Sequence, residues 1–319
     1  MLKSRFTGLV ALAAAFALTA CGAQDADSGA DGTPTASPST PTEAPSTPTE
    51  TPATPTEPSP TPTEPTETPT TDVGAAAYFM LMSGEEGPFL TPVWLPGVTD
   101  VEAALTALLA GPEAALAGTE FGTAGLSTAI PDGTELLEVT VVDGTATVNL
   151  SETFDDGGGS ASIMGRLTQL VYTATQFDAI DDVVLELEGD EVDVFSAEGL
   201  VLDQPMDRTD AYGNGFVPKL YLDRPAYGQT VGTEFELTGV ARDLFEATFV
   251  YELSDSADTI FAQGPVTASG SEGWNDYAIE VGYDATDAMP ITVTLYEGSA
   301  KDGSIVFMIS RPIRIDPAL

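Results

Sequence analysis

The sequence predicts an α+β protein in which a small mixed domain precedes an all-β sandwich, both behind a disordered Thr/Pro/Glu stalk. Strand and helix signals alternate over residues 75–211 in the order β-α-β-β-α-β-β, which favours a small mixed sheet with two helices packed on one face. Seven short strand-like segments fill residues 217–316, a pattern typical of an antiparallel sandwich. Residues 21–74 are rich in Thr, Pro, Ser and Glu, a composition that cannot bury a core.

Residues 1–20 have the pattern of an export signal. Lys3 and Arg5 precede an apolar run that is shorter than the roughly 20 residues needed to span a membrane. The run ends in Leu-Thr-Ala-Cys-Gly, which resembles the bacterial lipobox. This resemblance implies that Cys21, the only cysteine, receives a lipid and becomes the first residue after cleavage. The alternative is an ordinary secreted protein with a stray cysteine.

The stalk repeats Pro-Thr-Glu at positions 41, 48, 55 and 62 and again at 65. It contains no aromatic or large aliphatic residue between residues 33 and 71, so we expect an extended, proline-stiffened spacer. Its Thr/Ser/Pro composition also fits an O-glycosylated stalk, and that question stays open.

The chain is strongly acidic, with 50 Asp and Glu residues against 10 Lys and Arg. This charge argues against nucleic-acid binding and against contact with an anionic lipid surface, because both would repel it. A solvated acidic surface explains the composition, and attraction of cations or of a basic partner is the alternative.

In the first domain we expect a strand over 76–82 and a helix that Thr99 caps and that ends at Gly111-Pro112. A second helix is expected over 162–177. Two hairpins are expected around Asp143-Gly144 and Glu188-Gly189-Asp190, joining strands 136–142 with 145–150 and 183–187 with 192–195.

In the second domain we expect one buried face, carried by Phe235, Leu237 and Val240, with a local irregularity near Gly239. The seven expected strands are 219–223, 234–241, 247–253, 260–267, 274–281, 291–297 and 305–309.

Five segments occur in the order found in the GerMN (sporulation and germination) domain, which this part of the chain resembles. They are Val93-Trp94, Ala107–Pro112, Ser127–Pro131, Ala146–Ser151 and Gln169–Thr173. The family often has Asp where this chain has Asn149, which puts in doubt any role that needs that carboxylate. Segments 223–228, 237–241, 245–247 and 301–304 resemble the immunoglobulin-like module that accompanies GerMN domains in bacterial lipoproteins.

The chemistry available to the chain is limited. It has no histidine, which removes the usual general base and imidazole metal ligands, so we predict no enzyme and no cofactor. A pair of carboxylates acting on a glycoside is the remaining enzymatic alternative. Asp155 and Asp156 are weak calcium candidates, and a flexible connection is the other interpretation.

Aromatic residues offer further candidates. Trp94 and Trp274 are either ligand platforms or packing residues, and we favour packing. Tyr212, Tyr221 and Tyr227 are the first place to look for an exposed patch.

Together these features predict a non-enzymatic lipoprotein on the outer face of the cell membrane, anchored by acyl chains such as palmitate at Cys21. The family resemblance implies a docking, assembly or scaffold role with a protein partner of the envelope. The alternative is an extracytoplasmic protein that binds wall glycan, peptide or a divalent cation.

Overall fold

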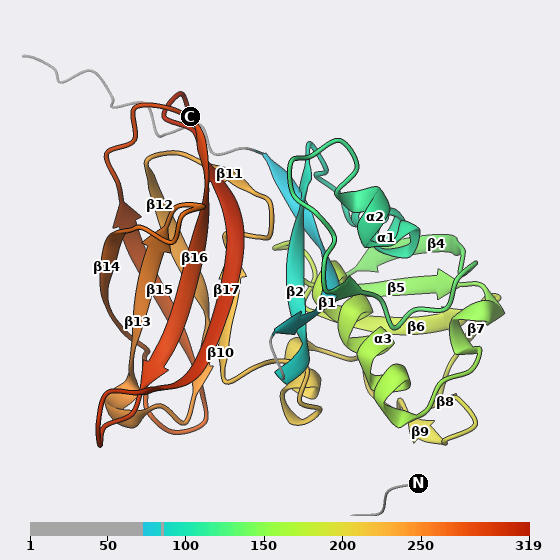
Figure 1. Cartoon of the computed structure of the whole chain (residues 1–319). Helices are drawn as coiled ribbons and strands as arrows, with labels where there is room; N and C mark the ends of the chain where they lie inside the picture. The colour runs from blue at the N-terminus through green and yellow to red at the C-terminus, as the bar shows by residue number, and fades with distance from the viewer. Residues whose placement is uncertain (1–72, 84–85) are drawn as a thin grey trace, which may run out of the picture. The chain divides into compact units, whose positions relative to one another are not determined.

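The computed structural model describes residues 73–83 and 86–319 (Figure 1). All of them belong to one compact unit, in which two domains each have a hydrophobic core. The predictions about the export signal, Cys21 and the stalk fall outside the described residues, except that Gly74, the last stalk residue, already begins a strand.

The first domain contains two sheets, where the sequence predicts one. In the first sheet, β1 (Gly74–Ser83) lies between its antiparallel neighbours β2 (Glu86–Pro96) and β3 (Leu126–Ser127). The second sheet has the order β4-β5-β6-β7, with β4 Leu136–Val142, β5 Thr145–Leu150, β6 Asp182–Leu187 and β7 Asp190–Glu191. A separate hairpin pairs β8 (Val194–Phe195) with β9 (Leu200–Val201).

The helices of this domain join the two sheets into one core. They are α1 (Val101–Ala110), the short α2 (Pro112–Ala115) and α3 (Ser160–Ala174). Helices α1 and α3 pack against each other; α1 also contacts β1 and β4, and α3 contacts β1 and β6. The connection through α3 allows β5 and β6 to run parallel. Asp100 caps α1, accepting from the Ala103 amide at 2.9 Å, so the prediction that Thr99 is the cap is wrong by one residue.

Both predicted hairpins form, on two-residue turns that need positive φ. Asp143 and Gly144 have φ of 51° and 93°, and Glu188 and Gly189 have φ of 51° and 88°. The second hairpin differs from its prediction, because Asp190 lies in β7 and the paired strand ends at Glu191.

Strand β2 is absent from the sequence prediction because it contains three prolines, which normally argue against a strand. They are tolerated here because β2 lies at the edge of its sheet, where not every backbone N–H has to pair with a neighbouring strand.

The second domain is a sandwich of a three-stranded sheet, β10-β12-β15, and a five-stranded sheet, β11-β17-β16-β13-β14. All seven predicted strands are present, β11 is additional, and β17 extends past the predicted end at residue 309. The bounds are β10 Leu220–Arg224, β11 Thr230–Val231, β12 Glu234–Arg242, β13 Thr248–Ser254, β14 Ile260–Thr267, β15 Trp274–Gly282, β16 Met289–Gly298 and β17 Ile305–Ile315.

Candidate functional site

Backbone hydrogen bonds connect the two domains along the edge of β2. The Leu90 amide donates to the Phe216 carbonyl at 2.8 Å. Trp94 and Tyr227 are joined in the same way, because the Trp94 amide donates to the Tyr227 carbonyl at 3.0 Å and the Tyr227 amide to Pro92 at 2.8 Å. The edge of β2 is therefore continued by the segment that leads into the sandwich.

Side chains from both domains share a hydrophobic cluster at this junction. Tyr78, Trp94 and Tyr172 from the first domain pack there with Tyr221 and Ala226 from the second, and all five are less than 10% exposed. This cluster is separate from the two domain cores.

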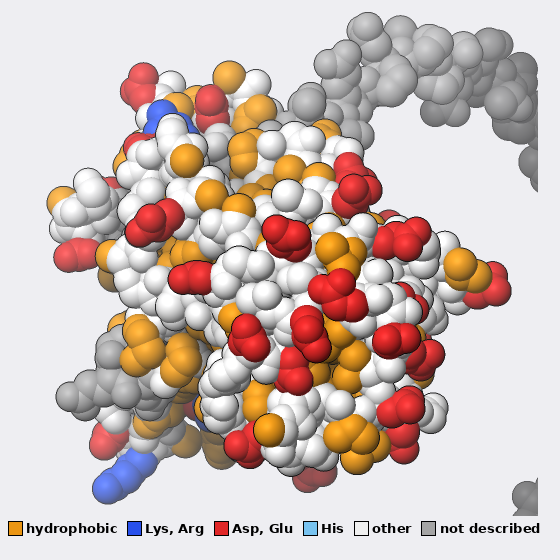
Figure 2. All heavy atoms as spheres, turned by 90° about the vertical axis from the view of Figure 1, so that its right-hand side faces the viewer, with side chains coloured by type: hydrophobic (Ala, Val, Ile, Leu, Met, Phe, Trp, Pro, Cys, Tyr) orange, Lys and Arg blue, Asp and Glu red, His pale blue; other side chains and the backbone are white. Residues whose placement is uncertain are grey.

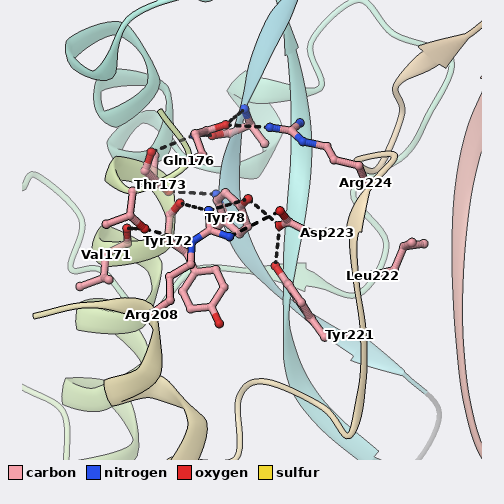
Figure 3. A network of polar contacts seen from close by, with 12 residues as sticks. Tyr78, Val171, Tyr172, Thr173, Gln176, Arg208, Tyr221, Leu222, Asp223 and Arg224 are labelled. Carbon is pink, nitrogen blue, oxygen red and sulfur yellow. Dashed lines mark hydrogen bonds and ion pairs between the residues drawn. The ribbon is translucent and has the colours of Figure 1, made fainter. Parts of the chain in front are cut away.

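A polar network runs through the junction, with Arg208 at its centre (Figure 3). Arg208 lies in a short 3₁₀ helix, Arg208–Gly213, which an Asp207–Asp210 capping box begins. Its guanidinium donates to Thr175 Oγ1 at 3.0 Å and, at 3.4 Å each, to Asp223 Oδ2, the Tyr78 hydroxyl and the Tyr172 carbonyl. The same group lies 4.6 Å from the centre of the Tyr172 ring, a cation–π contact.

Asp223 reaches the network because it lies at a β-bulge. Leu222 pairs with Gly239 and Arg224 with Thr238, so Asp223 has no partner residue in β12. Beside the bulge the two strands lie so close that a Cβ at Gly239 would be 1.9 Å from the Tyr221 carbonyl oxygen. Glycine is therefore required at this position. The irregularity predicted near Gly239 lies instead in the neighbouring strand, at Asp223, because β12 pairs with β15 without a register shift. The prediction that Val240 shares a buried face with Phe235 and Leu237 is wrong, since Val240 packs against the junction cluster.

The ionisation states of the network follow from its surroundings. Burial opposes ionisation of Asp223, but the positive charges of Arg208 and Arg224 outweigh it and hold the pKa of this carboxyl below its usual value. Burial and the nearby Asp223 carboxylate raise the pKa of Tyr78 to about 12. Burial is also the main cause of the raised pKa of Tyr172 and of Tyr221. At neutral pH the network therefore contains neutral phenols around one ion pair. Such an arrangement can hold the two domains together and needs no change of protonation.

Side chains of α3, and of Gln176 just after it, hold β1 in place beside this network. β3 pairs only with Met80 and Leu81, so much of this edge of β1 has no strand partner. Gln169 Nε2 donates to the Tyr78 carbonyl at 2.9 Å, and Thr173 Oγ1 accepts from the Tyr78 amide at 3.1 Å. Gln176 makes two further bonds, both of 2.6 Å, with the Ala76 backbone. These residues satisfy backbone groups that a missing strand would otherwise pair.

The calcium candidates lie in a loop that is organised by an arginine. Arg166, 1% exposed, donates to the carbonyls of Phe154, Asp156 and Gly157 and to Ser162 Oγ. A guanidinium thus occupies the centre of this carbonyl-lined loop. Within residues 73–83 and 86–319, no group of three or more His, Cys, Asp and Glu side chains is arranged to hold a metal ion.

The other candidate residues are placed as follows. Asn149 Oδ1 accepts from the Gly189 amide at 3.0 Å and so fixes the turn between β6 and β7. Trp94 is buried and Trp274 stacks on Tyr212 with 4.3 Å between ring centres, as packing residues do. The expectation of an exposed tyrosine patch is wrong for Tyr221 and Tyr227, which are 2% and 8% exposed.

Two hollows lie near the network. One of about 230 Å³ is lined by side chains of both domains, including Tyr172, Tyr212 and Asp223. The other, of about 340 Å³, is an apolar groove between α3 and residues 200–214 with acidic residues at its rim.

The surface of the first domain is almost purely negative. Residues 73–213 contain 25 acidic residues and two basic ones, Arg166 and Arg208. Both arginines are used inside the fold, which leaves the acidic side chains without exposed positive neighbours from this domain. Figure 2 shows the result: red side chains are spread over the face with orange ones between them, and blue ones lie only near its left margin.

Comparison with known proteins assigns both domains. Residues 76–193 match the Germane family model, described as sporulation and spore germination. Residues 220–304 match the Gmad2 model, described as the immunoglobulin-like domain of bacterial spore germination. The first domain is thus similar to the Germane family and the second to the Gmad2 family, and we call them the Germane and Gmad2 domains after these matches. No curated protein matches it.

Solved structures show more distant likeness. The first GerMN domain of the sporulation protein GerM from Bacillus subtilis is 22% identical, with 43% of this chain and 99% of that chain covered and a TM-score of 0.36. The tandem GerMN domains of the same protein are 16% identical, with 76% of this chain and 60% of that chain covered and a TM-score of 0.36. A putative lipoprotein from Clostridium perfringens is 21% identical, with 44% of this chain and 90% of that chain covered and a TM-score of 0.29.

None of the helices in the described part of the chain has both the length and the apolar character required to cross a membrane.

Proposed function

We propose that this protein is a non-enzymatic lipoprotein of the cell envelope in which the Germane and Gmad2 domains act together as one docking module for a protein partner. The observation that carries this proposal is the shared interface around Arg208 and Asp223, together with the backbone bonds of β2. Two domains held in one orientation present a fixed surface, which an assembly module needs and a flexible tether does not supply.

The chemistry of the described residues supports a role in binding. Histidine is absent from the whole sequence, and the buried tyrosines of the network are neutral at physiological pH. The descriptions of both families refer to spore germination, and that of Germane also to sporulation, which supports a role of the module in an assembly of that kind.

The anchoring part of the proposal depends on Cys21. The two acyl chains of a diacylglyceryl group on its sulfur would hold the protein stably at the membrane, since each buried methylene contributes about 0.8 kcal/mol. Mass spectrometry of the N-terminal peptide from native cells should find that residue lipidated, and Cys21→Ser should release the protein from the membrane fraction. A free thiol at Cys21 together with an uncleaved leader would contradict the proposal that the protein is anchored by a lipid.

Site-specific photo-crosslinking in intact cells tests the docking role. A benzophenone amino acid would replace exposed residues of the Germane domain, Glu113 and Glu198, and of the Gmad2 domain, Gln263 and Ala278. We expect crosslinks to one recurring envelope protein, and we expect them to weaken in Cys21→Ser. The absence of any recurring crosslinked protein would contradict the proposal.

A second function is favoured by one observation, the apolar groove beside α3. An extracytoplasmic protein could hold part of a peptide or wall glycan there. A ligand that binds only the folded state raises the melting temperature. Melting with muropeptides and with calcium therefore separates the two functions, and a shift of several degrees with either of them would favour ligand binding.

A further inference from the structure

Strand β4 is an edge strand with unusual side chains. It pairs with β5 on one side, and no strand within the described residues pairs with its other side. It exposes three large apolar residues, Leu137, Val141 and Val142, at 45%, 42% and 66%. An edge strand with exposed apolar side chains is a template for pairing with another chain.

Four other edges are covered or protected. The edge of β1 is occupied by the α3 side chains, and that of β2 by Phe216 and Tyr227. Strand β14 contains Pro265, which interrupts pairing, and β15 exposes Asp276, Ala278 and Glu280. Among the described strands, β17 also exposes three large apolar residues, Ile305, Val306 and Met308, but it pairs with β16 and, near its end, with β11, whereas β4 pairs with β5 alone.

The charges near β4 indicate what kind of chain fits there. Glu138 of β4 pairs with Asn149 of β5. Asn149 pairs on its other side with Glu186 of β6, and Glu186 pairs with Glu191 of β7. These four residues form one row on the same face of the sheet, and the row ends at Glu138 on the open edge. Neither arginine of the domain is available to balance it, so a basic residue on an added strand would gain a cross-strand ion pair.

The other face of β4 is apolar. Val139 and Val141 lie opposite Val148 and Ala146, which are both in the core. An added strand would therefore place alternate residues beside Glu138 on one face and beside Val139 and Val141 on the other, because side chains alternate along a strand.

We propose that β4 binds an extended segment of a partner protein in which apolar residues alternate with lysine or arginine. This inference rests on the proposed docking function and names the surface and the partner chemistry. A second copy of this chain is disfavoured, since it would bring a domain with the same excess of acidic residues against this edge.

Hydrogen exchange with synthetic peptides tests the inference. The probes are a ten-residue peptide of alternating Lys and Val and a control peptide of alternating Glu and Val, added to the mature chain carrying Cys21→Ser. We expect the Lys/Val peptide to slow exchange over residues 136–142 by about tenfold or more, and the Glu/Val peptide to leave it unchanged.

Two variants and a matched control locate the site. Glu138→Lys and Val141→Lys should reduce binding of the Lys/Val peptide at least about tenfold, because one reverses the terminal charge of the row and the other adds a repelling charge at the edge. Glu280→Lys makes the same charge change on β15 and should bind as the parent does. Circular dichroism would verify that all three variants fold.

Protection that appears outside β4, or an equal loss of binding in Glu280→Lys, would overturn the inference. So would a dimer seen by sedimentation in which residues 136–142 are already protected without peptide. If the peptide test fails while in-cell crosslinks to an envelope protein persist, the docking function stands and only this surface is wrong.

Discussion

Replacing Arg208 by methionine is expected to destabilise the protein by about 2–4 kcal/mol. The change removes hydrogen bonds between a charged group and its partners, which are worth about 1.5–3 kcal/mol, and a cation–π contact of about 0.5–2 kcal/mol. It also leaves Asp223 partly buried with only Arg224 and more distant charges to balance it. We take the lower part of the resulting range of about 2–5 kcal/mol because the Arg208 and Asp223 side chains keep 27% and 22% of their accessible surface.

Urea unfolding followed by tryptophan fluorescence would measure this change. Trp94 reports on the Germane domain and Trp274 on the Gmad2 domain, so parallel single-tryptophan versions show whether the two unfold together. In the parent we expect coincident transitions, and in Arg208→Met separate ones. Arg242→Ala is the control, because this partly exposed arginine contacts the Trp274 ring outside the network. A loss below about 0.5 kcal/mol with transitions that still coincide would refute the reasoning.

Three further predictions address single contacts. Gly239→Ala should cost more than about 3 kcal/mol in thermal unfolding, because its Cβ would meet the Tyr221 carbonyl; a smaller loss would mean that the bulge can relax. Gln169→Leu should cost about 2–4 kcal/mol by urea unfolding, since it leaves the Tyr78 carbonyl and the Ala129 amide unpaired, and near-neutral stability would contradict this. Tyr78 has a pKa that rises from 10.0 to about 12 on folding, so its contribution is complete below pH 10 and is lost as pH rises from 10 to 12. Urea unfolding at pH 8 and 11 should therefore show a smaller loss in Tyr78→Phe than in the parent, and an equal loss would assign the alkaline effect to other groups.

The sequence predicted the Gmad2 strands well because each buries one face and alternates with turn residues. Leu237 and Val293, for example, are fully buried within strands predicted from this alternation. Strand β2 could not be predicted in this way. Its three prolines argue against a strand, and its position at a sheet edge, where they are tolerated, depends on the tertiary fold.

The interface could not be predicted from local patterns, since it joins residues far apart in the chain. Tyr78 and Asp223 are 145 positions apart, and nothing in either neighbourhood indicates the other. One signal was available in the composition. The first domain has only two arginines among 25 acidic residues, so these arginines were candidates for internal contacts with carboxylates or carbonyls. The polar residues Gln169 and Thr173 gave a second signal, because they occur at helical spacing among the buried residues of α3.

The distance between the two domains in solution tests the central claim most directly. With Cys21→Ser as background, the chain has no other cysteine, so Glu113→Cys and Gln263→Cys can each carry a spin label, one per domain. Pulsed electron spin resonance should then give one narrow distance distribution, which broadens in Arg208→Met. A broad or multiple distribution in the otherwise unaltered protein would show that the domains move independently and would contradict a single docking module.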